Sequence, residues 1–116
     1  VFKKTYDLLL AVYKMTGSLS REYKYTIGEK LKNEMLELLL RVYRANLSWE
    51  KEVNIDLCRE STETVRLMVR VLYDLKQINM KKMIALNALI ENISKQLSGW
   101  RKSAGKSHSY HKKGVV

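Results

Sequence analysis

The chain has 116 residues, which is enough for one domain with a hydrophobic core of its own. It contains no proline, five glycines and one cysteine, a composition that argues against a turn-rich β-sandwich or barrel and excludes an internal disulfide. Its 22 lysines and arginines outnumber the 12 acidic residues and give a net charge of +10. A stable fold does not need such a surplus, so we expect a polyanionic partner.

No part of the chain carries the run of about 20 apolar residues that a membrane-spanning helix needs. The sequence also opens without the basic and apolar regions of a secretion signal, and its single thiol, Cys58, suits a reducing compartment. We therefore expect a soluble cytoplasmic protein that has no membrane partner.

Apolar residues recur every three or four positions in four segments, which is the spacing of an amphipathic helix. In the first segment, which ends near Gly17, the predicted buried face is Phe2, Tyr6, Leu9 and Tyr13. The second begins at about Thr26, where Thr26 and Glu29 can form a capping box, and it ends near Asn46. Its predicted buried face is Leu31, Met35, Leu38, Val42 and Ala45.

The third helix is predicted from about Trp49 to Lys76, with a break around residues 55–61, where serine and threonine weaken the helix. Its predicted buried face is Leu57, Thr64, Met68, Val71 and Leu75. The fourth helix follows a turn at residues 77–79 and has the cleanest pattern of the four. Its predicted buried face is Met83, Leu86, Ile90, Ile93, Leu97 and Trp100.

Four helices joined mainly by short loops pack most economically as an antiparallel up-down-up-down bundle. The predicted fold class is therefore all-α, a four-helix bundle over residues 1–100. Residues 101–116 carry five cations and no acid and lose the helical period, so we predict a flexible basic tail.

The sequence lacks the residue combinations of an enzyme active site. Its two histidines, His108 and His111, both lie in the predicted tail, where without cysteine or carboxylate neighbours they make a poor metal site. Two carboxylate pairs at i,i+3 spacing in the predicted helices lack the histidines of a di-metal bundle, so surface ion pairing accounts for them better. We therefore predict no catalysis, no cofactor and no metal, and a packed Cys58 without a role.

Three groups of basic residues are candidates for binding a nucleic acid. Cations around Tyr23 and Tyr25 can meet phosphate and base together, although these tyrosines can equally cover the end of the core. Three arginines share a face of the third helix, where phosphate contact competes with intrahelical pairing to Glu63. Cations of the tail can lie along phosphates, or can simply make a solubilising terminus. The candidates are Arg21, Lys24, Lys30, Lys32, Arg59, Arg66, Arg70, Arg101, Lys102, Lys106, Lys112 and Lys113.

Two of the predicted helices carry more apolar residues than one buried face can hide. The second helix has Leu36, Leu39, Leu40 and Tyr43 beside its predicted buried face. The third has Val65, Leu67, Val69, Leu72 and Tyr73. Because a small bundle has little room for a helix that is apolar over a wide arc, we expect a homo-oligomer whose interface includes these four residues of the second helix.

The segment from Leu19 to Leu31, LSREYKYTIGEKL, resembles the Phe-Pro-Lys-x-x-Arg-Tyr-x-Leu-Gly motif that opens the second helix of certain small bacterial four-helix-bundle proteins. These are the 23S rRNA intervening-sequence proteins and the accessory variability determinant (Avd) proteins of diversity-generating retroelements. The segment LSGWRKS at residues 97–103 is similar to the Gly-Trp-basic ending of the Avd branch, and residues 70–76 are similar to the close of its third helix. Leu19 and Ser20 depart from the Phe-Pro of the motif.

The resemblance covers most of residues 1–103 and implies a bundle that assembles into a homopentameric barrel. It also implies binding of RNA or DNA through a basic surface and association with a reverse transcriptase in mutagenic cDNA synthesis, in a bacterial or phage-encoded system. The basic positions of the motif fall on Arg21 and Lys24, its glycine on Gly28, which we expect to be a close-packing position, and the basic ending on residues 100–102. A ribosome-associated intervening-sequence protein and a protein-only oligomeric scaffold are the alternatives.

Overall fold

A computed structural model describes the backbone of residues 1–115 and the side chains of residues 1–105. The described backbone contains helices and no strand: α1 (Phe2–Thr16), α2 (Arg21–Lys24), α3 (Ile27–Leu47), α4 (Lys51–Asp74) and α5 (Met80–Val115). α2 is a single turn of four residues, so four long helices form the body of the fold. Over the described residues, no helix is long and apolar enough to cross a membrane.

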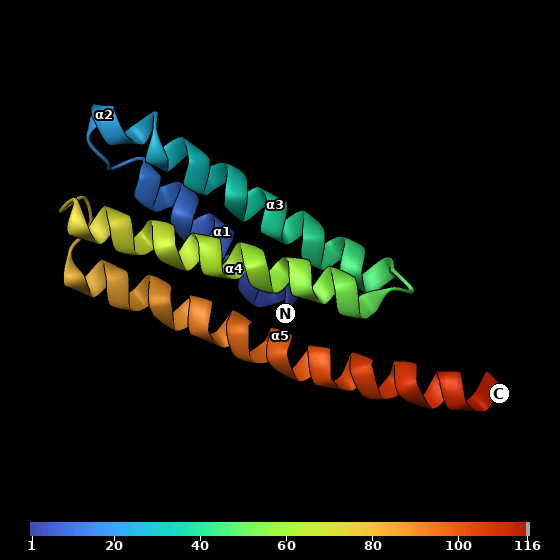
Figure 1. The fold of residues 1–116 in the computed structure, drawn as a ribbon. Helices are drawn as coiled ribbons and strands as arrows, with labels where there is room; N and C mark the ends of the chain where they lie inside the picture. The colour runs from blue at the N-terminus through green and yellow to red at the C-terminus, as the bar shows by residue number, and fades with distance from the viewer. Residues whose placement is uncertain (116) are drawn as a thin grey trace.

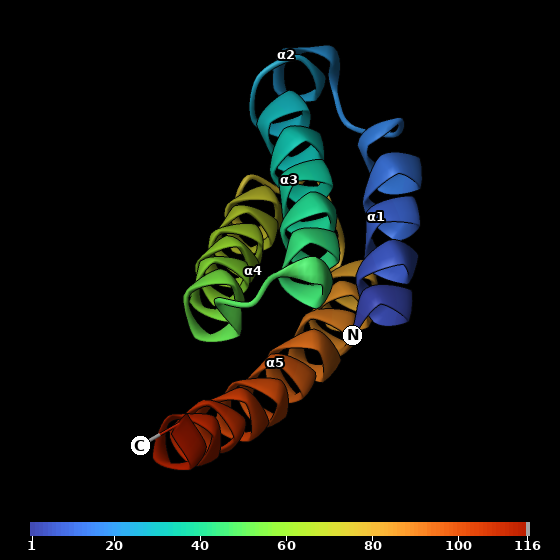
Figure 2. The ribbon, with the colours of Figure 1, turned by 90° about the vertical axis from the view of Figure 1, so that its right-hand side faces the viewer.

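The four long helices alternate in direction and form the predicted up-down-up-down bundle (Figure 1). α1 and α4 each pack against both α3 and α5, and Figure 2 shows α3 between α1 and α4. The α1–α3 connection, which includes α2, lies at the same end as the α4–α5 turn, whereas the α3–α4 turn lies at the other end (Figure 1). α5 continues past that other end, so the molecule is elongated, with extents of 59 × 22 × 20 Å.

The buried faces of α3 and α5 confirm the sequence pattern. In α3 the fully buried residues are Leu31, Met35, Leu38, Val42 and Ala45. In α5 the core residues are Leu86, Ile90, Ile93 and Leu97, with Met83 and Trp100 packed against them. Both helices bury apolar residues at regular spacing, which is the situation that a periodic pattern describes correctly.

The predicted buried face of α1 is wrong. The residues that face the core are Thr5, Leu8, Val12, Met15 and Thr16, while Phe2, Tyr6 and Tyr13 are exposed and Leu9 is half-buried. Threonine can occupy the core here because its hydroxyl is satisfied inside the helix. Thr5 Oγ1 donates to the carbonyl of Val1 at 2.8 Å, and Thr16 Oγ1 donates to that of Tyr13 at 3.0 Å.

Two predictions for α4 are wrong: the helix has no break at residues 55–61, and it buries a different face. Its buried residues are Ile55, Cys58, Ser61, Thr62, Val65, Val69 and Leu72. The predicted set of Leu57, Thr64, Met68, Val71 and Leu75 is exposed or half-buried. Two satisfied hydroxyls explain the difference, because Thr62 Oγ1 donates to the Cys58 carbonyl at 2.8 Å and Ser61 Oγ accepts from Nη1 of Arg41 at 2.9 Å.

The predicted capping box at the start of α3 is not formed. Thr26 precedes α3 as expected, but its hydroxyl donates to the carbonyl of Glu22 at 2.8 Å. Glu29 pairs instead with Lys32, at 3.3 Å between Oε2 and Nζ. The reason is α2, a helical turn in a segment without an apolar period. It ends at Lys24, and the carbonyl of its Glu22 accepts the hydrogen bond of the Thr26 hydroxyl.

Gly28 is a close-packing position, as expected. A Cβ atom on Gly28 would lie 3.0 Å from Cδ1 of Leu19 and 3.0 Å from the carbonyl oxygen of Tyr23. Any larger side chain would therefore push against both the buried Leu19 and the backbone of α2. The absence of a side chain at this one position lets α2 pack directly on the first turn of α3.

α5 continues without a break past residue 100, where the sequence predicts the end of the bundle. Ala104 is buried against the core, and the guanidinium of Arg101 contacts two acids of α4. Residues 101–105 are therefore part of the bundle and not of a tail. The side chains of the remaining predicted tail cations and histidines lie outside the described residues: Lys106, Lys112, Lys113, His108 and His111.

Candidate nucleic-acid interface

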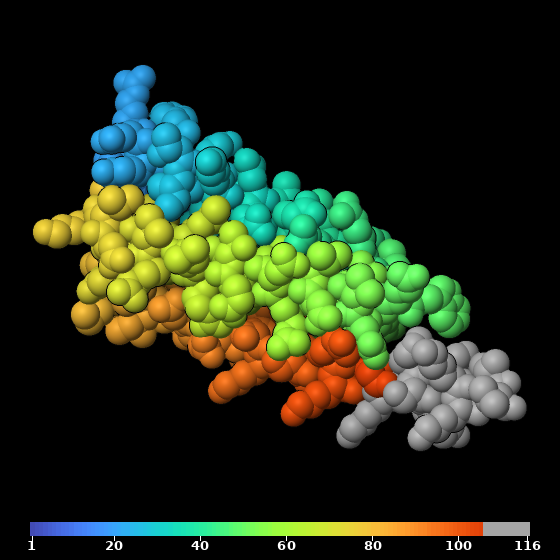
Figure 3. All heavy atoms as spheres, viewed as in Figure 1, coloured from blue at the N-terminus to red at the C-terminus, as the bar shows by residue number. Residues whose placement is uncertain are grey.

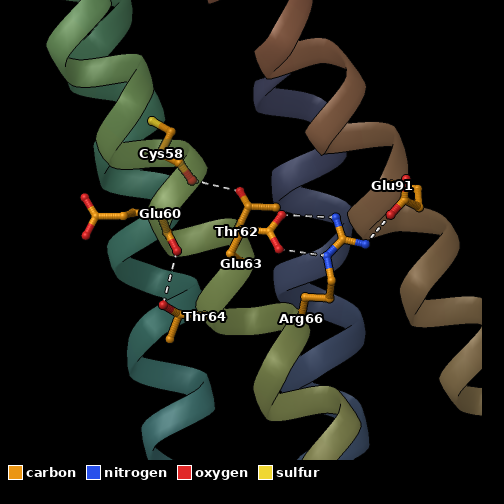
Figure 4. Close-up of polar contacts among 7 residues, drawn as sticks. All are labelled: Cys58, Glu60, Thr62, Glu63, Thr64, Arg66 and Glu91. Carbon is orange, nitrogen blue, oxygen red and sulfur yellow. Dashed lines mark hydrogen bonds and ion pairs between the residues drawn. The ribbon is translucent and has the colours of Figure 1, made fainter.

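Two of the three arginines predicted to share a face of α4 are bound by acids on α4 and α5. Arg66 Nε lies 3.2 Å from Oε2 of Glu63, and its Nη1 contacts Glu91 on α5 (Figure 4). Burial lowers the pKa of Arg66, but the hydrogen bonds and charges of Glu91 and Glu63 outweigh that effect and hold the pKa above its usual value. Arg70 Nε lies 3.2 Å from both carboxylate oxygens of Asp74. A phosphate would have to displace a carboxylate at either arginine.

Arg59 and Arg101 share a carboxylate partner. Arg59 Nη1 lies 3.6 Å from Oδ1 of Asp56, and Arg101 Nε lies 3.0 Å from the same oxygen. Arg101 Nη1 also lies 3.6 Å from Oε2 of Glu52. The arginines on the α4–α5 side therefore join α4 to itself and to α5, which is the intrahelical and interhelical pairing that competes with phosphate contact.

An open groove of about 560 Å³ runs between α4 and α5. Three carboxylates line it, those of Asp56, Glu60 and Glu63, against the single guanidinium of Arg59. Of these residues, Figure 4 shows Glu63, which contacts Arg66, and Glu60, which points away from the Arg66 ion pairs. An acidic lining repels phosphate, so this groove is a poor site for a nucleic acid.

The predicted cations around α2 lie in a different environment. Arg21 and Lys30 are exposed, and the half-buried Lys24 lies with Nζ 6.0 Å from the centroid of the Tyr25 ring. Among the described residues, none of these three cations forms an ion pair. Their charges are therefore available to an outside anion.

The fold brings three further lysines to this end, and sequence reasoning missed them. The amide of Ser20 donates to Oε1 of Gln77 at 3.0 Å, and Leu19 and Ile78 are both buried in the core. The α1–α3 connection and the α4–α5 turn therefore touch, as the neighbouring blue and yellow atoms in Figure 3 show. The exposed lysines that the turn contributes are Lys76, Lys81 and Lys82. In an antiparallel four-helix bundle these two connections lie at the same end. The predicted fold could therefore have placed the three lysines beside the cations around α2.

We call these six residues the basic end: Arg21, Lys24, Lys30, Lys76, Lys81 and Lys82. A depression of about 340 Å³ lies at the α4–α5 turn, lined by Met15 and Ser18 on one side and by residues 77–79, Lys81 and Lys82 on the other. The first turn of α5 carries no acid, so its two lysines add to the positive N-terminal end of the helix dipole. The local potential at the basic end is therefore positive.

Lys76 occupies a backbone position that usually belongs to glycine. Its φ is 60°, in the left-handed region. The amide of Lys76 donates to the Tyr73 carbonyl and that of Gln77 to the Leu72 carbonyl, both at 2.9 Å, which is the Schellman ending of a helix. A lysine here costs about 1 kcal/mol relative to glycine, and it adds one more cation to the basic end.

An apolar stripe runs along the exposed faces of α1 and α3 and begins beside the basic end. Lys32 marks the junction, because its Nζ lies 5.7 Å from the centroid of the Tyr13 ring on the neighbouring helix. The stripe consists of residues that are 39–55% exposed: Phe2, Tyr6, Leu10, Tyr13, Leu36, Leu40 and Tyr43. Leu39 is half-buried at its edge. The interface residues predicted on α3 thus lie together at the surface, whereas Val65, Val69 and Leu72 of α4 are core residues.

Cys58 is fully buried between the helices. Burial raises the pKa of its thiol from 9.0 to about 11, although the charge of Arg41 lowers it. The thiol therefore stays protonated and unreactive, which confirms a packed cysteine. Across the part of the chain that the structure describes, no three histidine, cysteine, aspartate or glutamate side chains come together to hold a metal ion.

Comparison with known proteins gives one assignment. The family model described as bAvd-like matches residues 1–104, a span that includes α2, the basic end and the apolar stripe. No curated protein matches the chain. The family is one of accessory proteins that is not known for catalysis, and its name indicates an accessory role in a diversity-generating retroelement. From the match over nearly its whole length, the chain belongs to the bAvd-like family.

Proposed function

We propose that this protein is a non-catalytic accessory protein of a diversity-generating retroelement that binds RNA or DNA through the basic end. The observation that carries the proposal is the gathering of six cations which, over the described residues, have no carboxylate partner. Unpaired cations attract phosphates and release counterions on binding, whereas a paired arginine must first lose its carboxylate. The net charge of +10 adds a longer-range attraction toward the same polyanion.

The remaining predicted cations contribute unequally to this proposal. Arg101 is held by Asp56 and Glu52, whereas Lys102 is exposed. Lys106, Lys112 and Lys113 add three charges beyond the described side chains. We assign the main phosphate contacts to the basic end and additional, sequence-independent contacts to these C-terminal lysines.

We further propose that the protein works as a homo-oligomer, a pentamer, which associates with a reverse transcriptase in mutagenic cDNA synthesis. The support from the structure is the apolar stripe of α1 and α3, which a monomer would leave in contact with water. The support for the reverse transcriptase is membership of the bAvd-like family. The stripe lies beside the basic end, so subunits joined through it would bring several basic ends near one another.

Fluorescence anisotropy of labelled single-stranded RNA and DNA across a salt series tests nucleic-acid binding. The triple variant Lys76→Gln/Lys81→Gln/Lys82→Gln is expected to weaken binding about 10- to 100-fold at 0.1 M salt and to lower the salt slope by about 2, because each phosphate contact contributes about 0.7. The matched control Arg59→Gln/Arg66→Gln/Arg70→Gln removes the same charge from paired positions and is expected to change binding far less. Circular dichroism checks that both variants stay folded.

Two results would contradict the proposal. Equal losses in the two triple variants would mean that total charge, and not the basic end, governs binding. No binding of the unaltered protein at low salt would exclude the nucleic-acid role altogether. That result would favour a protein-only oligomeric scaffold, the candidate that the apolar stripe alone supports.

A further inference from the structure

Tyr25 is an exposed aromatic residue in the α2 part of the basic end. It follows directly after α2, and its side chain is 67% exposed. Lys24 Nζ is 6.0 Å from the ring centroid, and Arg21 and Lys30 flank it along the chain. An exposed aromatic ring with one cation beside it and two more close by in the chain has the composition of a stacking platform for a base whose phosphates are held nearby.

The segment that carries Tyr25 is held in place from three directions. The backbone of α2 lies against Gly28, where even a Cβ would come within 3.0 Å of the Tyr23 carbonyl oxygen. The side chain of Leu19, just before α2, is buried in the core. The amide of Ser20 is bonded to Gln77 at 3.0 Å. The ring is thus presented from a fixed backbone, which reduces the entropy that binding would cost.

Whether the Tyr25 ring adds to the binding affinity depends on whether the bases are paired. In a duplex the bases are already stacked and their faces are covered, so an exposed ring gains little and only the phosphates are read. In a single strand the base faces are free, and stacking on an aromatic side chain adds to the phosphate contacts. A surface that combines phosphate-binding cations with one open aromatic ring therefore discriminates in favour of unpaired nucleic acid.

We propose that the basic end is a binding site for single-stranded nucleic acid, with Tyr25 stacking on an unpaired base and the surrounding cations holding its phosphates. This inference rests on the proposed function and adds to it a preference for unpaired strands and an aromatic contact. It requires no base-specific hydrogen bonds, so the site accepts either RNA or DNA.

The test compares one labelled strand, alone and annealed to its complement, at equal length and salt, with the full-length protein. The single strand is expected to bind more tightly, and Tyr25→Ala is expected to weaken its binding roughly fivefold or more while changing duplex binding little. Tyr25→Phe keeps the ring and is expected to bind as the unaltered protein does. Trp49→Ala is the matched control, because Trp49 is 97% exposed and lies at the opposite end of the bundle.

Three other outcomes would contradict the inference, the role of Tyr25 or the proposed function. Equal affinity for strand and duplex, with no effect of Tyr25→Ala, would overturn the inference and leave phosphate binding by the basic end intact. A single-strand preference that survives Tyr25→Ala would overturn the assignment to Tyr25. Absence of binding to both probes would overturn the inference together with the proposed function.

Discussion

The α4–α5 side and the α1–α3 side of the bundle differ in how their surface side chains are partnered. On the α4–α5 side the arginines are bound to acids of the same chain, as in the contacts of Arg66 with Glu63 and Glu91. On the α1–α3 side, apolar rings and leucines are exposed in one stripe, and this stripe adjoins the basic end, where the α1–α3 connection and the α4–α5 turn bring together cations without ion pairs in the described structure. The arginines of the α4–α5 side are thus already paired within the chain, whereas the cations of the basic end are available to a partner.

Counting charges therefore does not locate a binding surface. Both regions are rich in cations, and the sequence analysis names candidates in each: Arg21, Lys24 and Lys30 at the basic end, and Arg59, Arg66 and Arg70 on α4. The two regions differ in whether their cations have carboxylate partners. A carboxylate within ion-pairing distance cancels most of the attraction of a cation for a phosphate. The same reasoning applies to apolar residues, because Val65, Val69 and Leu72 of α4 are buried whereas Leu36, Leu40 and Tyr43 of α3 are exposed.

The largest expected effect comes from placing charge in the apolar stripe. In Leu36→Glu/Leu40→Glu, two carboxylates would be buried without partners at a subunit interface, so we expect dissociation to a monomer of 13.6 kDa. Light scattering measures the mass, and circular dichroism checks that helicity is retained. Leu67→Glu is the matched control, because Leu67 is 64% exposed on α4 outside the stripe. A folded variant with unchanged mass would show that the stripe is not the interface.

Two truncations of the C-terminal part of α5 separate the paired Arg101 from the lysines that follow it. A chain ending at Gly105 loses Lys106, Lys112 and Lys113 and is expected to keep its melting temperature while the salt slope falls by about 2. A chain ending at Trp100 also loses the ion pairs of Arg101 and the buried Ala104. It is expected to be less stable by roughly 1 kcal/mol in thermal unfolding. Identical melting temperatures for the two truncations would contradict the structural role of residues 101–105.

A third prediction disturbs the packing that holds the basic end. Gly28→Val places a branched side chain against Leu19 and the backbone of α2, so it is expected to cost about 1–3 kcal/mol of stability and to weaken single-strand binding by displacing Tyr25. Gly99→Ala is the control, since a Cβ on Gly99 meets nothing within 4 Å and alanine favours a helix interior by about 1 kcal/mol. Denaturant unfolding measures both. A Gly28→Val protein as stable as the unaltered chain would mean that α2 is not tightly packed.

The extent to which the fold could be predicted follows from what fills the core. α3 and α5 bury apolar residues, and the sequence pattern identifies their faces correctly. α1 and α4 bury Thr5, Thr16 and Thr62, whose hydroxyls bond to carbonyls of their own helices. A pattern based on apolar residues cannot count these positions, so it selects a neighbouring face of each helix.

The basic end could be predicted only in part, because half of its cations are brought there by the packing of the helices. The cations around α2 are close in sequence to an exposed tyrosine, and local reasoning finds them. Lys76 and Lys81 are far away in sequence and reach the basic end only through the antiparallel packing of the helices. Arg101 was predicted to bind phosphate but is paired, because Asp56, which lies 45 residues earlier in the chain, and Glu52 reach it only in the folded bundle.

The smallest expected effect tests whether ion pairing is what keeps the arginines of the α4–α5 side from binding phosphate. Glu63→Gln/Glu91→Gln removes the carboxylates that hold Arg66, so a paired cation becomes available to phosphate. We expect binding of single-stranded nucleic acid to strengthen about fivefold at 0.1 M salt, which corresponds to one added contact with a slope of about 0.7. The lost ion pairs are expected to lower stability by less than about 1 kcal/mol, because they are largely exposed.

A matched variant separates the release of Arg66 from the loss of two negative charges. Glu34→Gln/Glu60→Gln removes the same charge from two acids which, in the described part of the chain, form no ion pair, so it frees no arginine. If it strengthens binding as much as Glu63→Gln/Glu91→Gln does, only the overall potential matters. If it strengthens binding less, the carboxylate partners of Arg66 are what keep the α4–α5 side from binding a nucleic acid.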